Sequence, residues 1–272
     1  MNLLTAVLIA VVQGATEFLP ISSKAHDALV GRLLGVEEMP VAFLITIHLG
    51  TLLAVFLYYR HDLWAMVRSL FPAAREESET ALSQRCQYRR LFWLLLLGTI
   101  PAAVLGALFE SNIEAALNTP IYHGYGLLFT ALILTVASRL QGTRGLKETG
   151  WRQALGVGLA QSMALLPGVS RSGSTITAGL LCGFEREFAP RFAFLLSIPV
   201  ILGGFLFKVK DMVEAHVSGG LDPLTYPLSA LVAGVTGYFA IVLVINSVKR
   251  GNLLYFAAYC LAVGLTVILV CR

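Results

Sequence analysis

The chain alternates between long apolar runs and short polar segments over all of its 272 residues. Six apolar runs approach the length of about 20 residues that a helix needs to cross a bilayer. These runs are Val41–Tyr59, Leu91–Glu110, Ile121–Leu140, Phe188–Phe207, Tyr226–Asn246 and Leu253–Val270. Because they lack the polar stripe that a soluble helix carries, the pattern predicts an all-α integral membrane protein with six transmembrane helices.

Four further apolar stretches are shorter, and they form two pairs that are each interrupted by a proline. The first pair is Leu3–Leu19 and Ser23–Gly35, and the second pair is Gln153–Leu166 and Ser172–Gly183. Stretches this short barely equal or fall short of a bilayer, so each pair predicts a re-entrant helical hairpin that enters and leaves the membrane on one side. Irregular backbone at that depth must be surrounded by protein or water.

The two hairpin sequences resemble each other. When their prolines are superposed, Ser23 falls on Ser170 and Lys24 falls on Arg171. Each hairpin precedes three predicted spans, so an odd number of spans separates the two and they must lie in opposite orientations. The sequence therefore predicts one membrane domain, residues 1–272, built from two inverted repeats, 1–148 and 149–272, with a site at their interface.

Loop charges set the expected orientation. The segment Arg60–Arg90 contains six arginines, and Ser138–Arg152 is also basic, whereas Ser111–Pro120 has no lysine or arginine. The positive-inside rule places the basic connections in the cytoplasm and the uncharged one outside. We therefore expect the first hairpin to open outward and the second to open inward.

Composition supports a membrane protein and argues against other classes. Hydrophobic residues make up 57% of the chain and charged residues only 13%, whereas a soluble domain has about 25% charged residues. The net charge of +4 is modest and suits orientation in a membrane better than binding of nucleic acid. The four cysteines have no CxxC spacing, and we interpret them as small apolar side chains. Met1–Val12 lacks the basic start of a cleaved signal.

The first polar motif runs from Gln13 to His26. Gln13 and Glu17 are four residues apart and share a helix face. A carboxylate at membrane depth must be paired, bind a metal or be protonated, so Glu17 is either a functional acid or a structural partner of a cation. Ser22 or Ser23 can N-cap the helix after the break.

His26 lies about one turn into that second helix, near its positive end. A lone histidine is more often a structural hydrogen-bonding group than a catalyst. Because His26 shares the motif with Glu17 and Ser23, we predict a catalytic role.

The second polar motif runs from Pro167 to Thr175 and points to an anion. Gly168 permits a tight turn, and Ser170 or Ser172 can cap the next helix, whose free N–H groups attract negative charge. Arg171 adds a planar fork of donors that matches phosphate oxygens. The first turn adds the hydroxyls of Ser174 and Thr175. The structural alternative is a capped helix with an arginine that reaches the interface.

Other histidines lack comparable neighbours in the sequence. His48 lies within a predicted span, where it can hydrogen-bond across helices. His61, His123 and His216 lie near span ends, and we predict that they are ordinary surface groups.

Together, the two motifs make the chain resemble the undecaprenyl-diphosphate phosphatases of the BacA/UppP type. The first family motif has Glu or Gln, three residues and Glu, followed by Phe-Leu-Pro-x-Ser-Ser-x-x-His, and it matches Gln13 to His26. The second, Pro-Gly-x-Ser-Arg-Ser-Gly-x-Thr, matches Pro167 to Thr175. The resemblance covers the full length.

The resemblance implies removal of the terminal phosphate from a C55 polyprenyl diphosphate, in a bacterial plasma membrane and in support of cell-wall synthesis. It implies an active site open to the periplasmic side. The catalytic residues would be Glu17, Ser23, His26 and Arg171. The substrate-binding residues would be Ser22, Lys24, Gly168, Ser170, Ser172, Ser174 and Thr175. Gln13 and Glu17 would bind a divalent cation, Mg²⁺ or Ca²⁺. The nucleophile is Ser23 or a water, and a homodimer is one open outcome for the oligomeric state.

One departure from the family pattern adds a charge. The family usually has Thr-Gly after the serine pair, where this chain has Lys24-Ala25. Lys24 can tighten phosphate binding, replace part of a metal's charge, or mark a different substrate. Gln13 in place of Glu lowers the acidic charge and weakens a metal site.

Two other functions compete with a phosphatase. A carrier for a lipid phosphate would also need inverted repeats and Arg171. It would not need serine, histidine and glutamate on one hairpin, which favours the enzyme. A catalytically inactive scaffold, in which Lys24 pairs with Glu17, is the third alternative.

Overall fold

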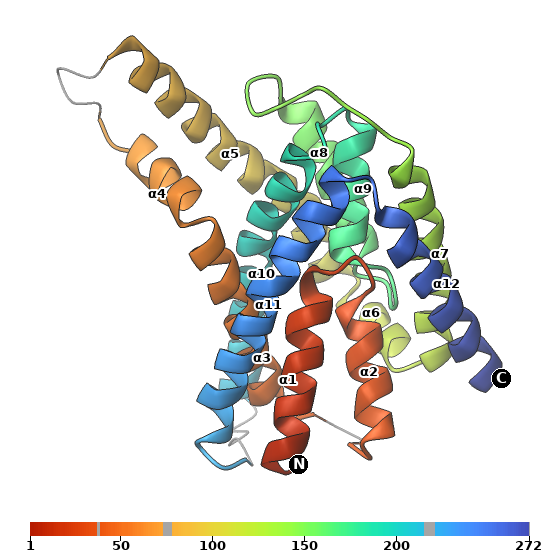
Figure 1. The fold of residues 1–272 in the computed structure, drawn as a ribbon. Helices are drawn as coiled ribbons and strands as arrows, with labels where there is room; N and C mark the ends of the chain where they lie inside the picture. The colour runs from red at the N-terminus through yellow and green to blue at the C-terminus, as the bar shows by residue number, and fades with distance from the viewer. Residues whose placement is uncertain (37–38, 73–77, 215–220, 272) are drawn as a thin grey trace.

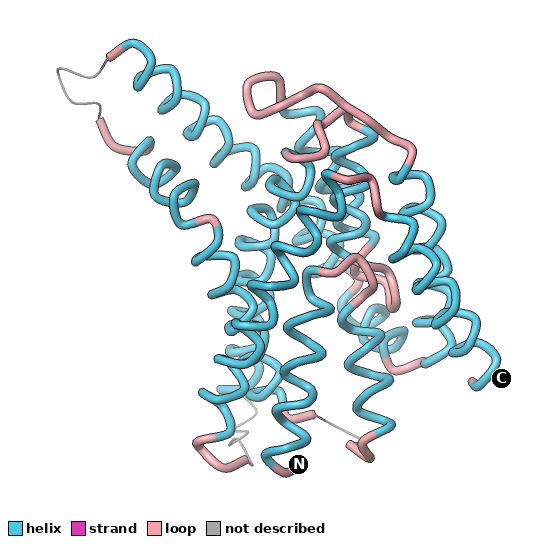
Figure 2. Tube along the Cα trace, viewed as in Figure 1, coloured by secondary structure: helices cyan, strands magenta, loops and turns pink. Residues whose placement is uncertain are grey.

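The computed structural model describes residues 1–36, 39–72, 78–214 and 221–271. Within these ranges the regular elements are helices (Figures 1 and 2), apart from one isolated β-bridge between Arg144 and Phe184. The helices are α1 (Leu3–Phe18), α2 (Ser23–Leu33), α3 (Val41–Tyr58), α4 (Arg60–Ser69), α5 (Glu79–Leu108), α6 (Glu110–Leu117), α7 (Pro120–Ser138), α8 (Trp151–Met163), α9 (Arg171–Leu181), α10 (Phe188–Glu214), α11 (Thr225–Lys249) and α12 (Leu253–Val270). The predicted all-α class is confirmed.

Six of these helices, α3, α5, α7, α10, α11 and α12, are long and apolar enough to cross a membrane. They correspond to the six predicted spans. The largest difference is in α5, which begins at Glu79 rather than at Leu91. The residues before Leu91 contain no proline or glycine and favour a helix, so the helix continues beyond its apolar part. The predicted connection Arg60–Arg90 is therefore largely helical, since it also contains α4.

The four shorter predicted helices are α1, α2, α8 and α9, and their ends lie within three residues of the predicted positions. Residues 19–22 join α1 to α2, and residues 164–170 join α8 to α9. We call these segments, each taken with the first two residues of the helix that follows, the first break and the second break. Figure 1 shows both breaks in the middle of the bundle, with α2 and α9 running from them towards opposite ends.

Small residues let the broken helices approach the long ones closely. A Cβ added to Gly14 of α1 would lie 1.9 Å from Thr236 Oγ1 of α11. A Cβ added to Gly158 of α8 would lie 2.3 Å from the carbonyl oxygen of Gly98 in α5. Such close backbone approach is typical of helix packing in membranes, and it fixes α1 and α8 against α11 and α5.

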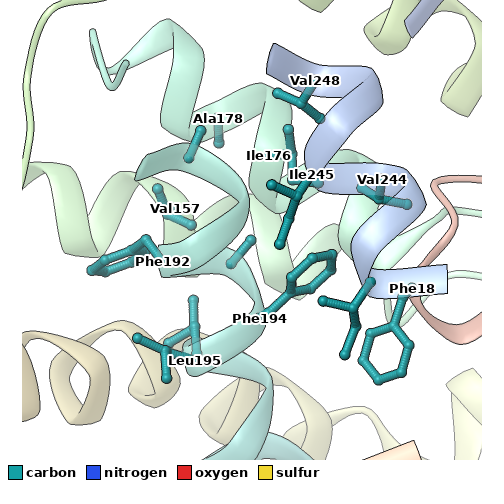
Figure 3. Packing of buried hydrophobic residues seen from close by; sticks show 14 of the residues in the cluster. Phe18, Val157, Ile176, Ala178, Phe192, Phe194, Leu195, Val244, Ile245 and Val248 are labelled. Carbon is teal, nitrogen blue, oxygen red and sulfur yellow. The ribbon is translucent and has the colours of Figure 1, made fainter. Parts of the chain in front are cut away.

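A core of buried apolar side chains lies behind the breaks, and Figure 3 shows part of it. Phe18, at the end of α1, packs edge-on against Phe194 of α10, with 5.5 Å between ring centroids. Both side chains are fully buried. An edge-to-face aromatic pair contributes about 0.5–1.5 kcal/mol beyond the burial of its surface. This contact therefore stabilises the position of the end of α1, just before the first break.

Candidate active site

The Glu17 carboxylate accepts hydrogen bonds from three other side chains of the polar site. It lies in the last turn of α1 and is 8% exposed. Its Oε2 atom accepts hydrogen bonds from Gln13 Nε2 at 3.0 Å and from Ser23 Oγ at 2.8 Å. Its Oε1 atom accepts a hydrogen bond from Arg171 Nη2 at 2.5 Å. The arginine offsets the charge of the buried carboxylate, which would otherwise be strongly destabilising.

The predicted side-chain cap of α2 is wrong. Ser22 occupies the N-cap position but makes no side-chain cap bond, and the Ser23 hydroxyl donates to Glu17 instead. Ser22 has φ 69°, and it is the one non-glycine residue with a positive φ in the described part of the chain. A capping serine normally has extended backbone, which directs its hydroxyl at the helix N–H groups. The left-handed conformation removes that geometry.

The second break has the predicted turn and the predicted cap. Gly168 has φ 76°, and a Cβ there would lie 2.1 Å from the carbonyl oxygen of His123. The Ser170 hydroxyl accepts a hydrogen bond from the Gly173 backbone N–H at 3.1 Å. Glycine is therefore required at the turn, and the serine oxygen satisfies one of the free N–H groups of α9.

Hydroxyls also connect the second break to its surroundings. The Ser172 hydroxyl donates to the carbonyl oxygen of Leu19, in the first break, at 3.1 Å. The Ser170 backbone N–H donates to the Thr130 hydroxyl of α7 at 3.0 Å. The first of these bonds links the two breaks directly, although they lie far apart in the sequence, and the second fixes the second break against α7.

Arg171 begins α9 and retains an unused donor. Its Nη1 atom is buried and, among the described residues, has no hydrogen-bond partner. The Thr175 hydroxyl donates to the Arg171 carbonyl oxygen at 2.8 Å, so it is turned towards the backbone. The Ser174 hydroxyl is buried and also lacks a partner in that part of the chain. The Nη1 atom therefore has a hydrogen bond left to donate to an anionic group.

A cavity of about 410 Å³ opens beside this cluster. Of the predicted site residues, those that line it are Glu17, Ser22, Ser23, Lys24, Ser170 and Arg171. The others, which do not line it, are Gln13, His26, Gly168, Ser172, Ser174 and Thr175. Most of the remaining wall is apolar and comes from α3, α5, α6, α10 and the second break. The cavity is suited to a molecule with an anionic head and an apolar tail.

The sequence did not assign several residues that line the cavity. Gln161, in α8, has its side-chain amide nitrogen and oxygen buried without a partner among the described residues. Glu110 and Glu114 contribute carboxylates from α6. His48 also lines the cavity, and its Nδ1 atom lies 2.8 Å from the Leu44 carbonyl oxygen of its own helix. Only the packing of α3 and α6 beside the breaks brings these side chains together.

One of the predicted surface histidines is not on the surface. His123 is 4% exposed, and its Nε2 atom lies 2.9 Å from the Leu117 carbonyl oxygen. The reason is the second break, which packs against the first turn of α7. His61 is exposed as predicted, and His216 lies outside the described residues.

His26 has partners on both sides of its ring. Its Nδ1 atom lies 2.9 Å from the Ser22 carbonyl oxygen, and its Nε2 atom lies 2.7 Å from the Tyr259 hydroxyl of α12. The ring therefore contacts the first break through the backbone. The hydrogen bonds of its side chain go to neither Glu17 nor Ser23, so its catalytic role stays a prediction.

The site offers two oxygen-bearing side chains, Glu17 and Gln13, to a divalent cation, which is fewer than a complete set of ligands. Within the described ranges, no three His, Cys, Asp or Glu side chains converge. Next to Glu17, however, Gln13 Oε1 is buried without a hydrogen-bond partner in those ranges. A carboxylate and an amide oxygen are ligands of the type that Mg²⁺ and Ca²⁺ prefer, and Mg²⁺ commonly adds substrate phosphates to one or two carboxylates. The residues therefore fit a cation that arrives with a phosphate ligand.

The fold and the site together define a class: a multi-pass membrane protein with a buried, hydroxyl-rich polar site. Comparison with known proteins then places the chain within that class. The sequence model of the family described as bacitracin resistance protein BacA matches residues 6–266. The chain belongs to this family.

Curated relatives are similar over almost their whole length. An undecaprenyl-diphosphatase of Alcanivorax borkumensis is 42% identical, with 98% of each chain covered. An undecaprenyl-diphosphatase of Alkaliphilus metalliredigens is 41% identical, with 99% of this chain and 98% of the relative covered. A third, from Chlorobium phaeobacteroides, is 37% identical over 98% of this chain and 96% of the relative.

Proposed function

We propose that this protein is an undecaprenyl-diphosphatase that hydrolyses undecaprenyl diphosphate to undecaprenyl phosphate and inorganic phosphate. The observation that carries the proposal is a single buried carboxylate, Glu17, which is shared by the Ser23 hydroxyl and the Arg171 guanidinium. A nucleophile, a base and an anion-binding cation thus meet at the cavity. The names of the relatives favour the phosphatase over a lipid carrier.

The bond from Ser23 to Glu17 favours serine over water as the nucleophile. At 2.8 Å the carboxylate is within reach of the proton that it would remove. Ser23 Oγ bonds to the terminal phosphorus, and the bond from that phosphorus to the bridging oxygen breaks. Glu17 takes the serine proton and passes it to the leaving undecaprenyl phosphate. A water oxygen then bonds to the phosphorus of the phosphoserine, and the bond from that phosphorus to Ser23 Oγ breaks. Glu17 transfers a proton from that water to Ser23 Oγ, and phosphate is released.

Arg171 links substrate binding to the strength of this base. Its Nη2 atom pairs with Glu17, while its Nη1 atom lacks a partner among the described residues. A phosphate that draws the guanidinium towards itself also removes positive charge from Glu17. A carboxylate that loses its cation becomes more basic. The substrate therefore activates the base that the reaction requires, and the positive end of α9 adds to the binding of the phosphate.

We further propose that Mg²⁺ or Ca²⁺ binds together with the diphosphate, with Glu17 and Gln13 as its protein oxygen donors. When bound, the cation supplies charge neutralisation for the transferred phosphoryl group. Lys24, which lines the same cavity, supplies part of the same positive charge.

The same proposal includes two re-entrant hairpins in inverted repeats, with the cavity open to the periplasmic side of a bacterial plasma membrane. Reciprocal packing supports the repeats: α1 packs on α11, the second span after α9, and α8 packs on α5, the second span after α2. Ser23 and Arg171 come from different halves and bind the same carboxylate. Accessibility of single cysteines to a membrane-impermeant reagent would test the orientation.

The direct test is release of phosphate by the purified protein from undecaprenyl diphosphate, with and without divalent cation. We expect turnover that depends on the cation and is lost in Glu17→Gln, which has nearly the same shape. A double variant, Glu17→Gln with Lys24→Met, distinguishes catalysis from charge pairing. If that double variant regains activity, Glu17 is a structural partner and not the base. Protein that moves labelled lipid across vesicles without releasing phosphate would instead be a carrier.

A further inference from the structure

The imidazole ring of His26 joins the first break to the last helix of the protein. The Tyr259 hydroxyl lies 2.7 Å from Nε2, and the two rings stack, with centroids 5.6 Å apart and planes 15° apart. On the other side, Nδ1 lies 2.9 Å from the Ser22 carbonyl oxygen. A carbonyl oxygen only accepts, so Nδ1 carries a proton and donates it. In the neutral ring Nε2 then accepts, and the Tyr259 hydroxyl is the donor.

The carbonyl oxygen that accepts from the His26 ring belongs to Ser22, whose backbone conformation is strained. Ser22 has φ 69° and ψ 96°, a region that residues with a Cβ adopt only when the surroundings hold them there. Its carbonyl oxygen accepts two hydrogen bonds from His26, one from the ring at 2.9 Å and one from the backbone N–H at 3.3 Å. His26 is 8% exposed, which protects these bonds from competition by water. Tyr259 in turn fixes the orientation of the ring.

The next residue along the chain is Ser23, whose hydroxyl donates to Glu17 at 2.8 Å. The peptide between Ser22 and Ser23 sets the direction in which the Ser23 side chain leaves the backbone. Relaxation of Ser22 to a negative φ would rotate that peptide and move the hydroxyl away from the carboxylate. A displacement of about 1 Å is enough to reduce a reaction rate strongly.

We propose that Tyr259 is a positioning residue for the phosphatase. Through His26, its hydroxyl holds the left-handed conformation of Ser22, and that conformation directs Ser23 at Glu17. The inference rests on the proposed function, and it assigns to the His26 ring a positioning role that needs no proton exchange with the substrate. Neither His26 nor Tyr259 lines the cavity, so the effect must appear in turnover and not in binding.

The first measurement is phosphate release by Tyr259→Phe, which removes the hydroxyl and keeps the stacked ring. We expect kcat to fall about tenfold, as for one missing hydrogen bond to a buried group, with KM unchanged. The matched control is Tyr255→Phe, the same change one turn earlier on α12, where the side chain is 76% exposed. Thermal unfolding and elution in detergent identify any loss of folded protein. A normal kcat in folded Tyr259→Phe would overturn the proposal.

A comparison of two backgrounds separates positioning from other roles. Glycine adopts positive φ without strain, so Ser22→Gly makes the turn independent of His26 and Tyr259. Ser22→Ala removes the same hydroxyl but keeps the strain. We expect Tyr259→Phe to cost about tenfold in the Ser22→Ala background and less than about threefold in the Ser22→Gly background. Equal losses in both backgrounds would overturn the proposal.

Failure of this inference and failure of the proposed function give different results. A wild-type protein that releases no phosphate under any cation condition contradicts the phosphatase itself. An active wild type whose Tyr259→Phe variant is equally active contradicts only the positioning role.

Discussion

The two breaks are built from similar sequences but use their serines differently. In the second break Gly168 has the positive φ, and the Ser170 hydroxyl oxygen accepts a hydrogen bond from the N-terminus of α9. In the first break a serine, Ser22, adopts the positive φ, and the hydroxyl of Ser23 donates to Glu17. Superposition of the motifs therefore matches a capping serine with one that faces a carboxylate.

This difference separates binding from chemistry. The second break has a glycine at its positive φ and a side-chain cap on its helix, which suits a platform that presents Arg171 and the remaining helix N–H groups to an anion. The first break is strained and leaves its helix uncapped, and strain of this kind persists only where the surrounding structure enforces it. We infer that the first break carries the reacting group and that the second break binds the phosphate.

The largest expected difference between the two breaks appears when the hydroxyl of Ser23 or of Ser170 is removed. We expect Ser23→Ala to lower kcat for phosphate release by at least about 10³-fold, as expected for loss of a nucleophile. Ser170→Ala should retain most turnover and lose about 1 kcal/mol of unfolding free energy, the usual value of a helix cap. Steady-state kinetics and thermal unfolding of both variants measure the changes in kcat and in unfolding free energy. Equal activity losses would mean that the two serines have equivalent roles.

The second prediction concerns Arg171, the cation of the second break. Arg171→Ala should lose about 2–4 kcal/mol of transition-state stabilisation, which is roughly 30- to 1,000-fold in kcat/KM. Arg171→Lys keeps the charge but loses the planar fork, so it should fall between Arg171→Ala and wild type. Steady-state kinetics at matched protein amounts measure the effect. Wild-type turnover in Arg171→Ala would exclude this role.

The third prediction compares the two residues with positive φ. Gly168→Ala should cost at least about 2 kcal/mol of unfolding free energy, because the new Cβ meets backbone at an unfavourable φ. A Cβ there would be 2.1 Å from the His123 carbonyl oxygen. Ser22→Gly should change stability by less than about 1 kcal/mol, since relief of strain offsets the entropy of glycine. Unfolding midpoints of the two purified variants test this difference. A Ser22→Gly protein as destabilised as Gly168→Ala would show that the first break is not strained.

The smallest expected effect concerns Lys24, which stands where the resemblance leads us to expect threonine. Lys24→Thr should raise the cation concentration for half-maximal activity about two- to fivefold, because one exposed charge contributes modestly. A titration of phosphate release with Mg²⁺ and Ca²⁺, with wild type and Lys24→Thr side by side, measures the shift. Superimposable curves would mean that Lys24 takes no part in neutralising the phosphate.

The sequence by itself determined the class of the fold and singled out three of the residues that meet in the polar site. Apolar length predicts six spans because a bilayer sets a fixed distance. Proline ends α1 and glycine turns the second break for local steric reasons, so the short helices were predicted to within three residues. Glu17, Ser23 and Arg171 were identifiable because charged and hydroxyl side chains are rare at membrane depth.

Only the tertiary structure decided how these residues meet. The ion pair of Arg171 with Glu17 and the bond from Ser172 to Leu19 depend on packing between elements far apart in the chain. The bond from Ser23 to Glu17 spans only six positions, but it needs the left-handed backbone of Ser22, which no local pattern indicates. The sequence gives no local signal for Tyr259 either, because α12 is uniformly apolar and its contact with His26 spans 233 positions. Periodicity and turn chemistry act over a few residues, whereas a catalytic geometry is set by long-range packing, which a local pattern does not contain.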